Sequence, residues 1–203
     1  MPHVIRDTDT LEALYGTPGE ASIVKEVGYV HPHYAAFIRA APFAVLATVG
    51  PGGMDASPRG DPAGFVAIED DRTLLLPDRR GNNRMDSLRN ILADPRVALL
   101  FLVPGIDETL RVNGRADISV APALLERFAL GGKPARSVLV VHVDTVYFQC
   151  SRALVRADLW NPETRLPRSA LPSTGTILAA LGAQFDSTQY DREQGPRVRA
   201  TLY

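Results

Sequence analysis

The sequence predicts a mainly β protein of the α+β class, in which an antiparallel barrel carries flanking helices and a helical N-terminal arm. Between residues 43 and 149 the chain contains about six or seven short runs of strand character. Turn sequences separate most of these runs, and helical patterns interrupt them at only two points. Strands joined by turns pair antiparallel, so this spacing favours an antiparallel barrel over a doubly wound parallel sheet.

The N-terminal arm, residues 1–41, is predicted to be helical. The run TDTLEALYG predicts a helix that Thr8 or Asp9 caps and Gly16 ends. The run HPHYAAFIRAA predicts a second helix that starts at its two histidines. Its apolar residues share one helical face, which is formed by Tyr34, Phe37, Ile38 and Ala41.

The first predicted strand is FAVLATVG, residues 43–50, which ends in a Gly-Pro-Gly-Gly turn. Residues 54–77 predict two or three more strands, with turns at 62–64 and 70–72. A strongly apolar strand follows at 96–105.

A helix is predicted over residues 84–94, between two of these strands, and Pro95 ends it. Asn82 or Asn83 is placed to cap this helix. Asp86 stands three residues after Asn83, in a pattern that resembles a capping box.

The second half of the predicted barrel begins with residues 108–120, which alternate like a long strand. Asn113-Gly114 inside this run indicates either a hairpin turn or a bulge. Residues 121–130 predict a helix that a Gly-Gly pair closes, and residues 137–150 predict one strand or a strand pair.

The C-terminal extension follows a short helical pattern at residues 151–160. It is rich in proline, serine and threonine, with a helical pattern at 174–185 and a final stretch that we expect to be disordered. We expect a single domain over 1–203, with the arm at 1–41, the barrel core at 42–160 and the extension at 161–203.

Composition excludes several classes of function. The net charge of −1 argues against general nucleic-acid affinity and against a polybasic membrane surface. Cys150 is the only cysteine, so an intrachain disulfide and a cysteine metal cluster are both impossible, and we expect a buried, inert thiol. The first residues lack a targeting pattern, and no run approaches the length of a membrane span. We therefore expect a cytoplasmic protein.

One stretch concentrates arginine where a predicted strand meets a predicted helix. In PDRRGNNRMDSLRNIL, residues 77–92, four arginines surround Gly-Asn-Asn. A helix N-terminus offers unpaired N–H groups and partial positive charge, and arginine adds two-pronged bonds, so the stretch could hold a phosphate or a carboxylate. In the alternative interpretation the arginines are solvated and pair locally with Asp78 or Asp86.

Two further polar clusters extend this hypothesis. Arg59 lies in the run SPRGD between strands one hairpin earlier, near the same end of the barrel. Thr109, Arg111 and Asn113 alternate onto one face of the long strand. The sequence contains neither a GxxxxGK[ST] nor a GxGxxG phosphate motif, and it has no GxSxG or HExxH motif of a hydrolase.

Taken together, the runs FAVLATVG, MDASPRGD, PDRRGNNR, LRVNGRA and FQCSRALVRADLW resemble the pyridoxamine 5'-phosphate oxidase-like family. The resemblance covers about residues 40 to 160 and is closest to a branch of FMN-dependent proteins. It implies an antiparallel six-stranded split β-barrel that forms a homodimer, with FMN bound between the subunits.

The resemblance also implies roles for individual residues. The family grips the FMN phosphate with a Thr-Asn-x-x-Ser-Arg-Lys run, which falls here on Asp78 to Arg84, with asparagine at the Ser and Arg positions. The arginine that precedes the second inner strand corresponds to Arg59. Thr109 stands where the family has a glutamine that reaches the flavin of the neighbouring subunit. The implied cofactor-binding set is Arg59, Asp78, Arg79, Asn82, Asn83, Arg84, Thr109 and Arg111.

These features predict an FMN-dependent oxidoreductase that acts on an unknown small molecule. The flavin would carry the chemistry, so no catalytic side chain is nominated. The alternatives are a non-catalytic flavin- or haem-binding module, an F420-dependent reductase, and a scaffold whose cofactor site has decayed. The end of the chain, DREQGPRVRATLY, lacks the Trp and His of the true vitamin B6 oxidases.

Several remaining side chains have weaker claims. Trp160 could cover a flavin edge or pack in the core, and Arg152 is a similar candidate. His142 and Asp144 share one strand face, but two residues do not make a metal site, so we expect no metal.

Overall fold

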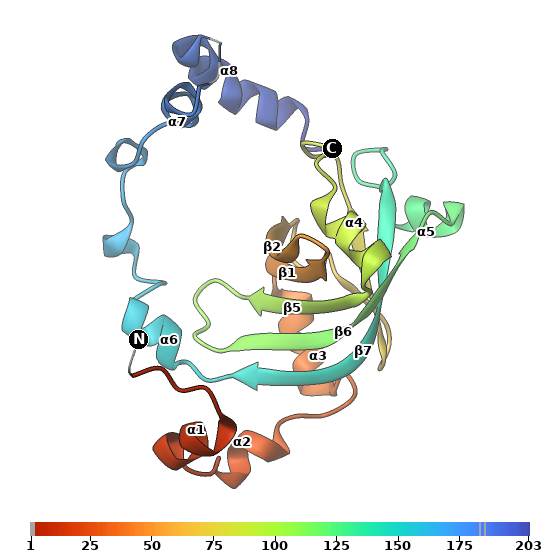
Figure 1. The fold of residues 1–203 in the computed structure, drawn as a ribbon. Coiled ribbons are helices and arrows are strands. Elements are labelled where there is room, and N and C mark those ends of the chain that lie inside the picture. Colours follow the sequence, from red (N-terminus) through yellow and green to blue (C-terminus); the bar gives the residue numbers. More distant parts are fainter. Residues whose placement is uncertain (1–2, 183, 185) are drawn as a thin grey trace.

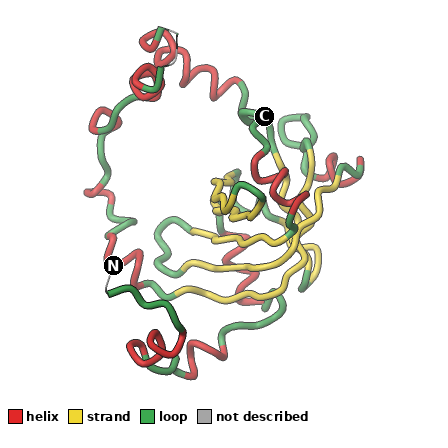
Figure 2. The backbone as a smooth tube through the Cα atoms, in the orientation of Figure 1, coloured by secondary structure: helices red, strands yellow, loops and turns green. Residues whose placement is uncertain are grey.

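In the described part of the chain, seven antiparallel strands form one curved sheet, and the helices lie around it (Figures 1 and 2). The computed structural model describes residues 3–182, 184 and 186–203. The strands are β1 (Phe43–Gly50), β2 (Gly53–Gly60), β3 (Ala67–Asp70), β4 (Thr73–Asp78), β5 (Arg96–Leu102), β6 (Thr109–Ser119) and β7 (Ser137–Gln149). They are hydrogen-bonded in the order β2-β1-β5-β6-β7-β4-β3, and every pair is antiparallel. The predicted α+β class with an antiparallel sheet is confirmed.

The six strands that the resemblance implied are one too few: the described residues form seven, the higher of the two counts that the strand pattern indicated. β3 spans only four residues and folds back onto β4, which places Ala67 opposite Leu75 and Ile68 opposite Leu74. So short a strand leaves little alternation for a sequence pattern to reveal. β2 and β3 stand at the two ends of the order, so the described sheet is open between them, an arrangement that is consistent with a split barrel.

The longest pairing joins β6 and β7, and it resolves two alternatives that the sequence left open. The register shifts at Asn113 and Gly114, so this pair forms a bulge inside one strand and not a hairpin turn. β7 is likewise a single strand of 13 residues. A Cβ atom on Gly114 would collide with the carbonyl oxygen of His142, so the bulge requires glycine at this position.

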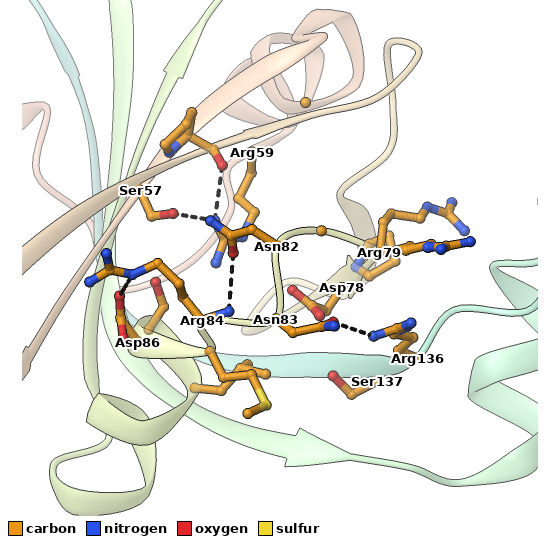
Figure 3. A pocket seen from close by; sticks show the side chains of 18 of the residues that line it. Ser57, Arg59, Asp78, Arg79, Asn82, Asn83, Arg84, Asp86, Arg136 and Ser137 are labelled. Carbon is orange, nitrogen blue, oxygen red and sulfur yellow. Dashed lines mark hydrogen bonds and ion pairs between the residues drawn. The ribbon is translucent and has the colours of Figure 1, made fainter. Parts of the chain in front are cut away.

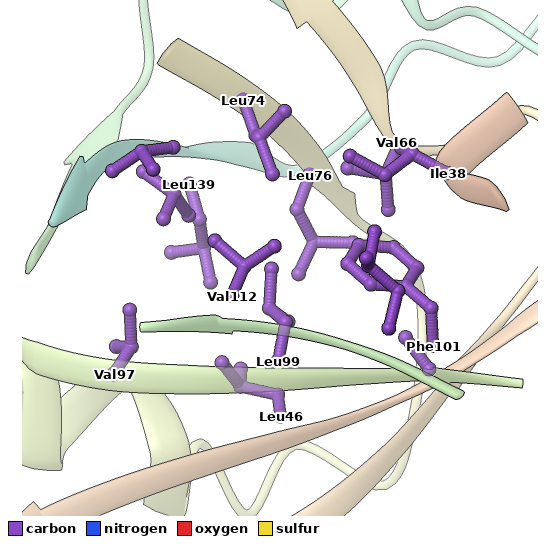
Figure 4. Close-up of a cluster of buried hydrophobic side chains, with 14 of the residues drawn as sticks. Ile38, Leu46, Val66, Leu74, Leu76, Val97, Leu99, Phe101, Val112 and Leu139 are labelled. Atoms are coloured by element: carbon purple, nitrogen blue, oxygen red, sulfur yellow. The ribbon is translucent and has the colours of Figure 1, made fainter. Parts of the chain in front are cut away.

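The hydrophobic core lies inside the curve of the sheet (Figure 4). Alternate residues of β1 and β5 point into it, including Leu46, Leu99 and Phe101, all at most 1% exposed. Helix α3 (Pro32–Ala40) adds Ile38 and is followed by buried Ala41, and the partly buried Tyr34 and Phe37 pack against the same cluster, so the predicted helical face is confirmed.

The helical arm contains α1 (Thr8–Tyr15) and α2 (Glu20–Val24) before α3. Gly16 ends α1 as predicted, but the predicted caps Thr8 and Asp9 are wrong. Asp7 is the cap, because its extended backbone lets the side chain accept a hydrogen bond of 2.8 Å from the N–H of Thr10.

Three short helices lie between or after the strands: α4 (Asp86–Ala93), α5 (Pro122–Arg127) and α6 (Arg152–Ala157). All three were predicted, and α4 contacts β1 most extensively. Its start is two residues later than predicted, for a reason that belongs to the site described below. Within the described residues, no helix combines the length and the apolarity that a membrane crossing needs.

The C-terminal extension leaves the sheet after α6, follows a wide arc and returns, so that its end lies near α4 (Figure 1). Two 3-10 turns (Pro162–Thr164 and Arg168–Ala170) precede α7 (Thr174–Ala180) and α8 (Ser187–Ala200). The helix predicted at 174–185 is present as α7, although residues 183 and 185 lie outside the described part.

The expected disorder of the final residues is wrong, because α8 occupies most of that stretch. Asp186 caps α8 by accepting from the N–H of Gln189, and Asp191 accepts from the N–H of Gly175 at 2.7 Å, which ties α8 to α7. The first bond caps a helix that contains Pro196, and the second joins two helices. The proline-rich composition of the tail therefore did not reveal them.

Candidate functional site

A cleft of about 610 Å³ opens where the arginine-rich turn meets the sheet. Its walls come from β2, from the turn between β4 and α4, from the start of α4 and from the start of β7 (Figure 3). Six residues of the predicted cofactor-binding set line it: Arg59, Asp78, Arg79, Asn82, Asn83 and Arg84. The structure therefore brings together two clusters that are separated by a hairpin in the sequence.

The turn itself adopts an unusual backbone. Asn83 has φ of 60° and Met85 has φ of 58°, both in the left-handed region. Asn82 accepts a hydrogen bond of 3.1 Å from the N–H of Arg84 through its Oδ1 atom, inside the turn. The helix therefore begins only at Asp86, with Met85 at the cap position.

The predicted caps of this helix, Asn82 and Asn83, are wrong, and so is the capping box. Both side chains are already engaged within or across the turn, and Asp86 bonds Arg84 instead of a backbone N–H. Met85 supplies no capping hydrogen bond. The first turn of α4 therefore begins without a side-chain cap at the edge of the cleft.

Arg59 supplies a partly buried positive charge to the cleft. It projects from β2, half-buried, and its Nη1 donates to Oγ of Ser57 at 2.6 Å and to the carbonyl of Pro58 at 2.9 Å (Figure 3). Burial lowers the pKa of Arg59, and the charges of Asp78 and Asp55 partly oppose this. The guanidinium stays charged at neutral pH, because the ordinary pKa of arginine lies far above neutrality.

Asp78 is the acidic counterpart of Arg59. Burial raises the pKa of this carboxyl group, while the charges of Arg59 and Arg136 pull it down. Each of these two opposite charges lowers the free-energy cost of burying the other. The described lining of the cleft contains five arginines and four aspartates in all.

Arg84 is an exposed arginine of the turn. Its side chain is 75% exposed, and its Nε donates to Oδ2 of Asp86 at 2.7 Å. Such a surface ion pair is weak, so the guanidinium can exchange this partner for an anion that enters the cleft.

Arg79 and Arg136 reach the cleft from different directions. Arg79 donates from Nε to Oδ2 of Asp61 at 2.8 Å and from Nη1 to the carbonyl of Phe128 at 2.6 Å, so its hydrogen bonds point away from Arg59. Arg136 donates from Nη1 to Oδ1 of Asn83 at 2.8 Å. Sequence reasoning missed Arg136, because only the pairing of β4 with β7 brings it beside the turn.

Thr109 and Arg111 do not join this cluster within one chain. They lie at the start of β6, whereas the described residue of β6 that lines the cleft is Ile118, roughly 30 Å beyond Thr109 and roughly 23 Å beyond Arg111 at about 3.3 Å per residue. Thr109 is only 4% exposed. Arg111 donates from Nη1 to the hydroxyl of Tyr147 at 2.8 Å.

The weaker candidates also lie outside the cleft lining. Cys150 is exposed, so its expected burial is wrong: it follows the last residue of β7, where the chain leaves the core. Trp160 donates from Nε1 to the carbonyl of Ile106 at 2.9 Å. His142 pairs with Asp117 at 3.0 Å. The described part of the chain contains no group of three or more side chains suited to a metal ion.

The fold and the cleft define an α+β protein whose antiparallel sheet carries an arginine-rich cleft at one end. The chain belongs to the pyridoxamine 5'-phosphate oxidase family, whose sequence pattern matches residues 30–150, more than half of its length. The match spans α3 to β7 and includes every residue of the predicted cofactor-binding set.

Solved structures resemble the fold at low sequence identity. A variant of HupZ from Group A Streptococcus matches with a TM-score of 0.50 and 16% identity, covering 59% of this chain and 99% of that chain. The General Stress Protein 26 from Bacillus anthracis matches with a TM-score of 0.43 and 18% identity, covering 56% and 88%. An FMN-binding protein from Syntrophomonas wolfei matches with a TM-score of 0.44 and 10% identity, covering 70% and 96%. No curated protein matches the chain by sequence.

Proposed function

We propose that this protein binds FMN in the arginine-rich cleft and acts as a flavin-dependent oxidoreductase on a small molecule. One observation carries the proposal: in a member of this family, the half-buried Arg59 and the exposed turn from Asn82 to Arg84 face one cleft of about 610 Å³. The residues suit a phosphate dianion, since guanidinium groups, an amide and the start of a helix all supply hydrogen-bond donors.

Each residue has a distinct part in holding the cofactor. Arg59 would supply the fixed charge, because its hydrogen bonds to Ser57 and Pro58 hold the guanidinium in place. Arg84 would release Asp86 and close on the phosphate from the solvent side. Asn82 would orient the turn and offer its amide N–H group. When bound, the flavin would supply hydride or electron transfer, and the protein would position it and exclude water.

The position of Arg111 supports a homodimer as part of this proposal. Thr109 and Arg111 lie roughly 30 Å and roughly 23 Å along β6 from their own cleft, at about 3.3 Å per residue, so they could serve a cofactor only in a second subunit. Thr109 is buried, whereas Arg111 is partly exposed and already oriented by Tyr147. Arg111 is therefore the residue of this pair that we expect to contact the neighbouring flavin.

The first experiment is the absorption spectrum of the purified protein, with the mass of any released cofactor. We expect a flavin spectrum and about one FMN per subunit. A colourless protein that also fails to take up added FMN would contradict the proposal. A mass other than FMN, such as F420 or haem, would assign the cleft to that cofactor instead.

The second experiment removes single charges. Loss of one charge-assisted bond should weaken FMN binding by about tenfold or more in Arg59→Ala and in Arg84→Ala. Arg156→Ala removes an exposed arginine on α6 and should leave FMN affinity unchanged. Reduction of the bound flavin by NADH or NADPH, followed by reoxidation, would support an enzyme, whereas bound flavin without turnover by any donor would favour a non-catalytic carrier.

A further inference from the structure

A second, smaller pocket of about 230 Å³ lies beside the candidate FMN cleft. Its described lining is Arg79, Arg80, Lys133, Pro134, Arg136 and Tyr203. The three arginines also line the larger cleft, so the two openings share one wall. In Figure 3, Arg79 and Arg136 extend to the side of the turn opposite Arg59 and Arg84.

The charged side chains that line this pocket are all cationic. Among the described residues that line it, four are cationic and none carries a carboxylate side chain. Arg79 forms an ion pair with Asp61, and the charge of Arg136 partly opposes the burial that raises the pKa of nearby Asp78. Arg136 also donates to the amide oxygen of Asn83, and Lys133 donates from Nζ to the main-chain oxygen of Tyr203, the last residue of the sequence, at 2.6 Å.

Arg80 is the most available of these cations. It is exposed, and no hydrogen-bond or ion-pair partner is present for it in the part of the chain that the structure describes. Arg80 and Lys133 lie beside Pro134 and Tyr203 in the lining of the pocket. Together they offer several hydrogen-bond donors to a small anion. An anion would satisfy them through charge-assisted bonds.

The pocket depends on the returning C-terminal segment. The hydroxyl of Tyr203 donates to Oδ1 of Asp61 at 3.0 Å, and the guanidinium of Arg79 lies 5.8 Å from the centre of the Tyr203 ring. Asp61, whose side chain is 7% exposed, therefore holds both Arg79 and Tyr203 in place. These contacts hold the Tyr203 side of the pocket in place, and arginine and lysine side chains form much of the remaining lining.

We propose that this pocket is a second anion-binding site, which takes a phosphate or carboxylate group next to the one held in the FMN cleft. The anion lies between Arg80 and Lys133, with Arg136 on the shared wall. The site does not require flavin, so it can be tested whether or not the protein binds FMN.

The test is isothermal titration calorimetry with inorganic phosphate on protein freed of any flavin. Arg59→Gln removes the main charge of the larger cleft, and this variant should still bind phosphate. Adding Lys133→Gln or Arg80→Gln should weaken that binding by about tenfold. Adding Arg156→Gln, a matched exposed charge, should not change it. Lys133→Gln and Arg80→Gln test the same site independently, so a folding defect in one variant does not decide the result. Thermal unfolding confirms that each variant is folded.

Two results would overturn the proposal: no phosphate binding by the Arg59→Gln variant, or binding that survives both Lys133→Gln and Arg80→Gln. A comparison of FMN with FAD then identifies the source of the anion. If it is a second phosphate on the cofactor, FAD binds wild-type protein more tightly than FMN, and Lys133→Gln removes this advantage. If it is a separate molecule, inorganic phosphate binds equally well with and without FMN.

Discussion

Arg136 donates a hydrogen bond of 2.8 Å to Oδ1 of Asn83, 53 residues away in the chain. The bond links the start of β7 to the arginine-rich turn, and it holds the one asparagine of that turn whose backbone is left-handed. The turn therefore depends on a partner outside itself. A cofactor phosphate would meet a turn that is already in place, which lowers the cost of ordering it on binding.

Substitution of Asn83 should separate its backbone role from its side-chain role. Both Asn83→Gly and Asn83→Ala lose the bond to Arg136, but only alanine is strained at a φ of 60°. We therefore expect Asn83→Ala to be less stable than Asn83→Gly by about 1 kcal/mol. Urea unfolding of the two variants measures the difference, and equal stabilities would show that the left-handed backbone is not maintained.

The pH dependence of stability should report Asp78. Burial raises the pKa of this group above its ordinary value of 3.8, so the folded state holds the proton more tightly than the unfolded state. Its contribution to stability is then fully present below pH 3.8 and is lost as the pH rises through the folded pKa. At neutral pH the buried carboxylate opposes folding.

Asp78→Asn removes this titration and serves as the comparison. The free energy of unfolding of the wild type, relative to the variant, should rise as the pH falls from 7 toward 4. Urea unfolding at several pH values measures it. A difference that stays constant, or that changes in the opposite direction, would contradict the raised pKa. Arg59→Gln should raise the pKa of Asp78 further, which NMR titration of the carboxyl group can detect.

The bulge in β6 gives a prediction about stability alone. In Gly114→Ala the new methyl group would collide with the backbone carbonyl of His142, which cannot move without breaking the β6–β7 pairing. We expect a loss of about 2–3 kcal/mol. Gly52→Ala, at a turn where nothing lies within 4 Å of the added atom, is the control and should change stability little. Denaturant midpoints compare the two.

The hydrogen bond from Tyr203 to Asp61, which anchors the C-terminal segment, can be tested by removing the tyrosine hydroxyl. Tyr203→Phe deletes the hydroxyl that donates to Asp61, a bond worth about 1 kcal/mol. We expect faster hydrogen exchange in the last turn of α8 and in the residues that follow it. Tyr15→Phe, which alters a tyrosine that is 78% exposed, should have no such effect. Unchanged exchange in Tyr203→Phe would mean that other contacts hold the segment.

Most strands could be predicted from the sequence, because burial on one face of a sheet imposes a period of two that the residues themselves display. In β1 and β5 the buried positions alternate with less buried ones, as the runs FAVLATVG and RVALLFL indicate. β3 was predicted only as an alternative, because residues 54–77 indicated two or three strands and a strand of four residues carries little pattern. The division of the chain into one domain with an arm and an extension stays a prediction.

The ends of elements were harder to predict, because capping depends on backbone conformation. Asn82 and Asn83 have the right chemistry for a cap, yet the left-handed backbone at Asn83 and Met85 delays the helix. Cys150 was expected to be buried from its aromatic neighbours, but it lies just beyond the end of β7. In both cases the sequence showed the residue type, but it did not reveal the backbone conformation or the position that decides what the side chain contacts.

The sequence by itself determined the class of the fold, the family and the position of the arginine-rich turn, because these depend on local pattern and on residues that are close together in the chain. Only the tertiary structure decided which distant residues meet that turn. The pairing of β4 with β7 brings Arg136 to Asn83, the β1–β2 hairpin carries Arg59 to the same cleft, and the returning tail places Tyr203 on Asp61. Such contacts follow from sheet register and chain topology, which a pattern of neighbouring residues does not encode.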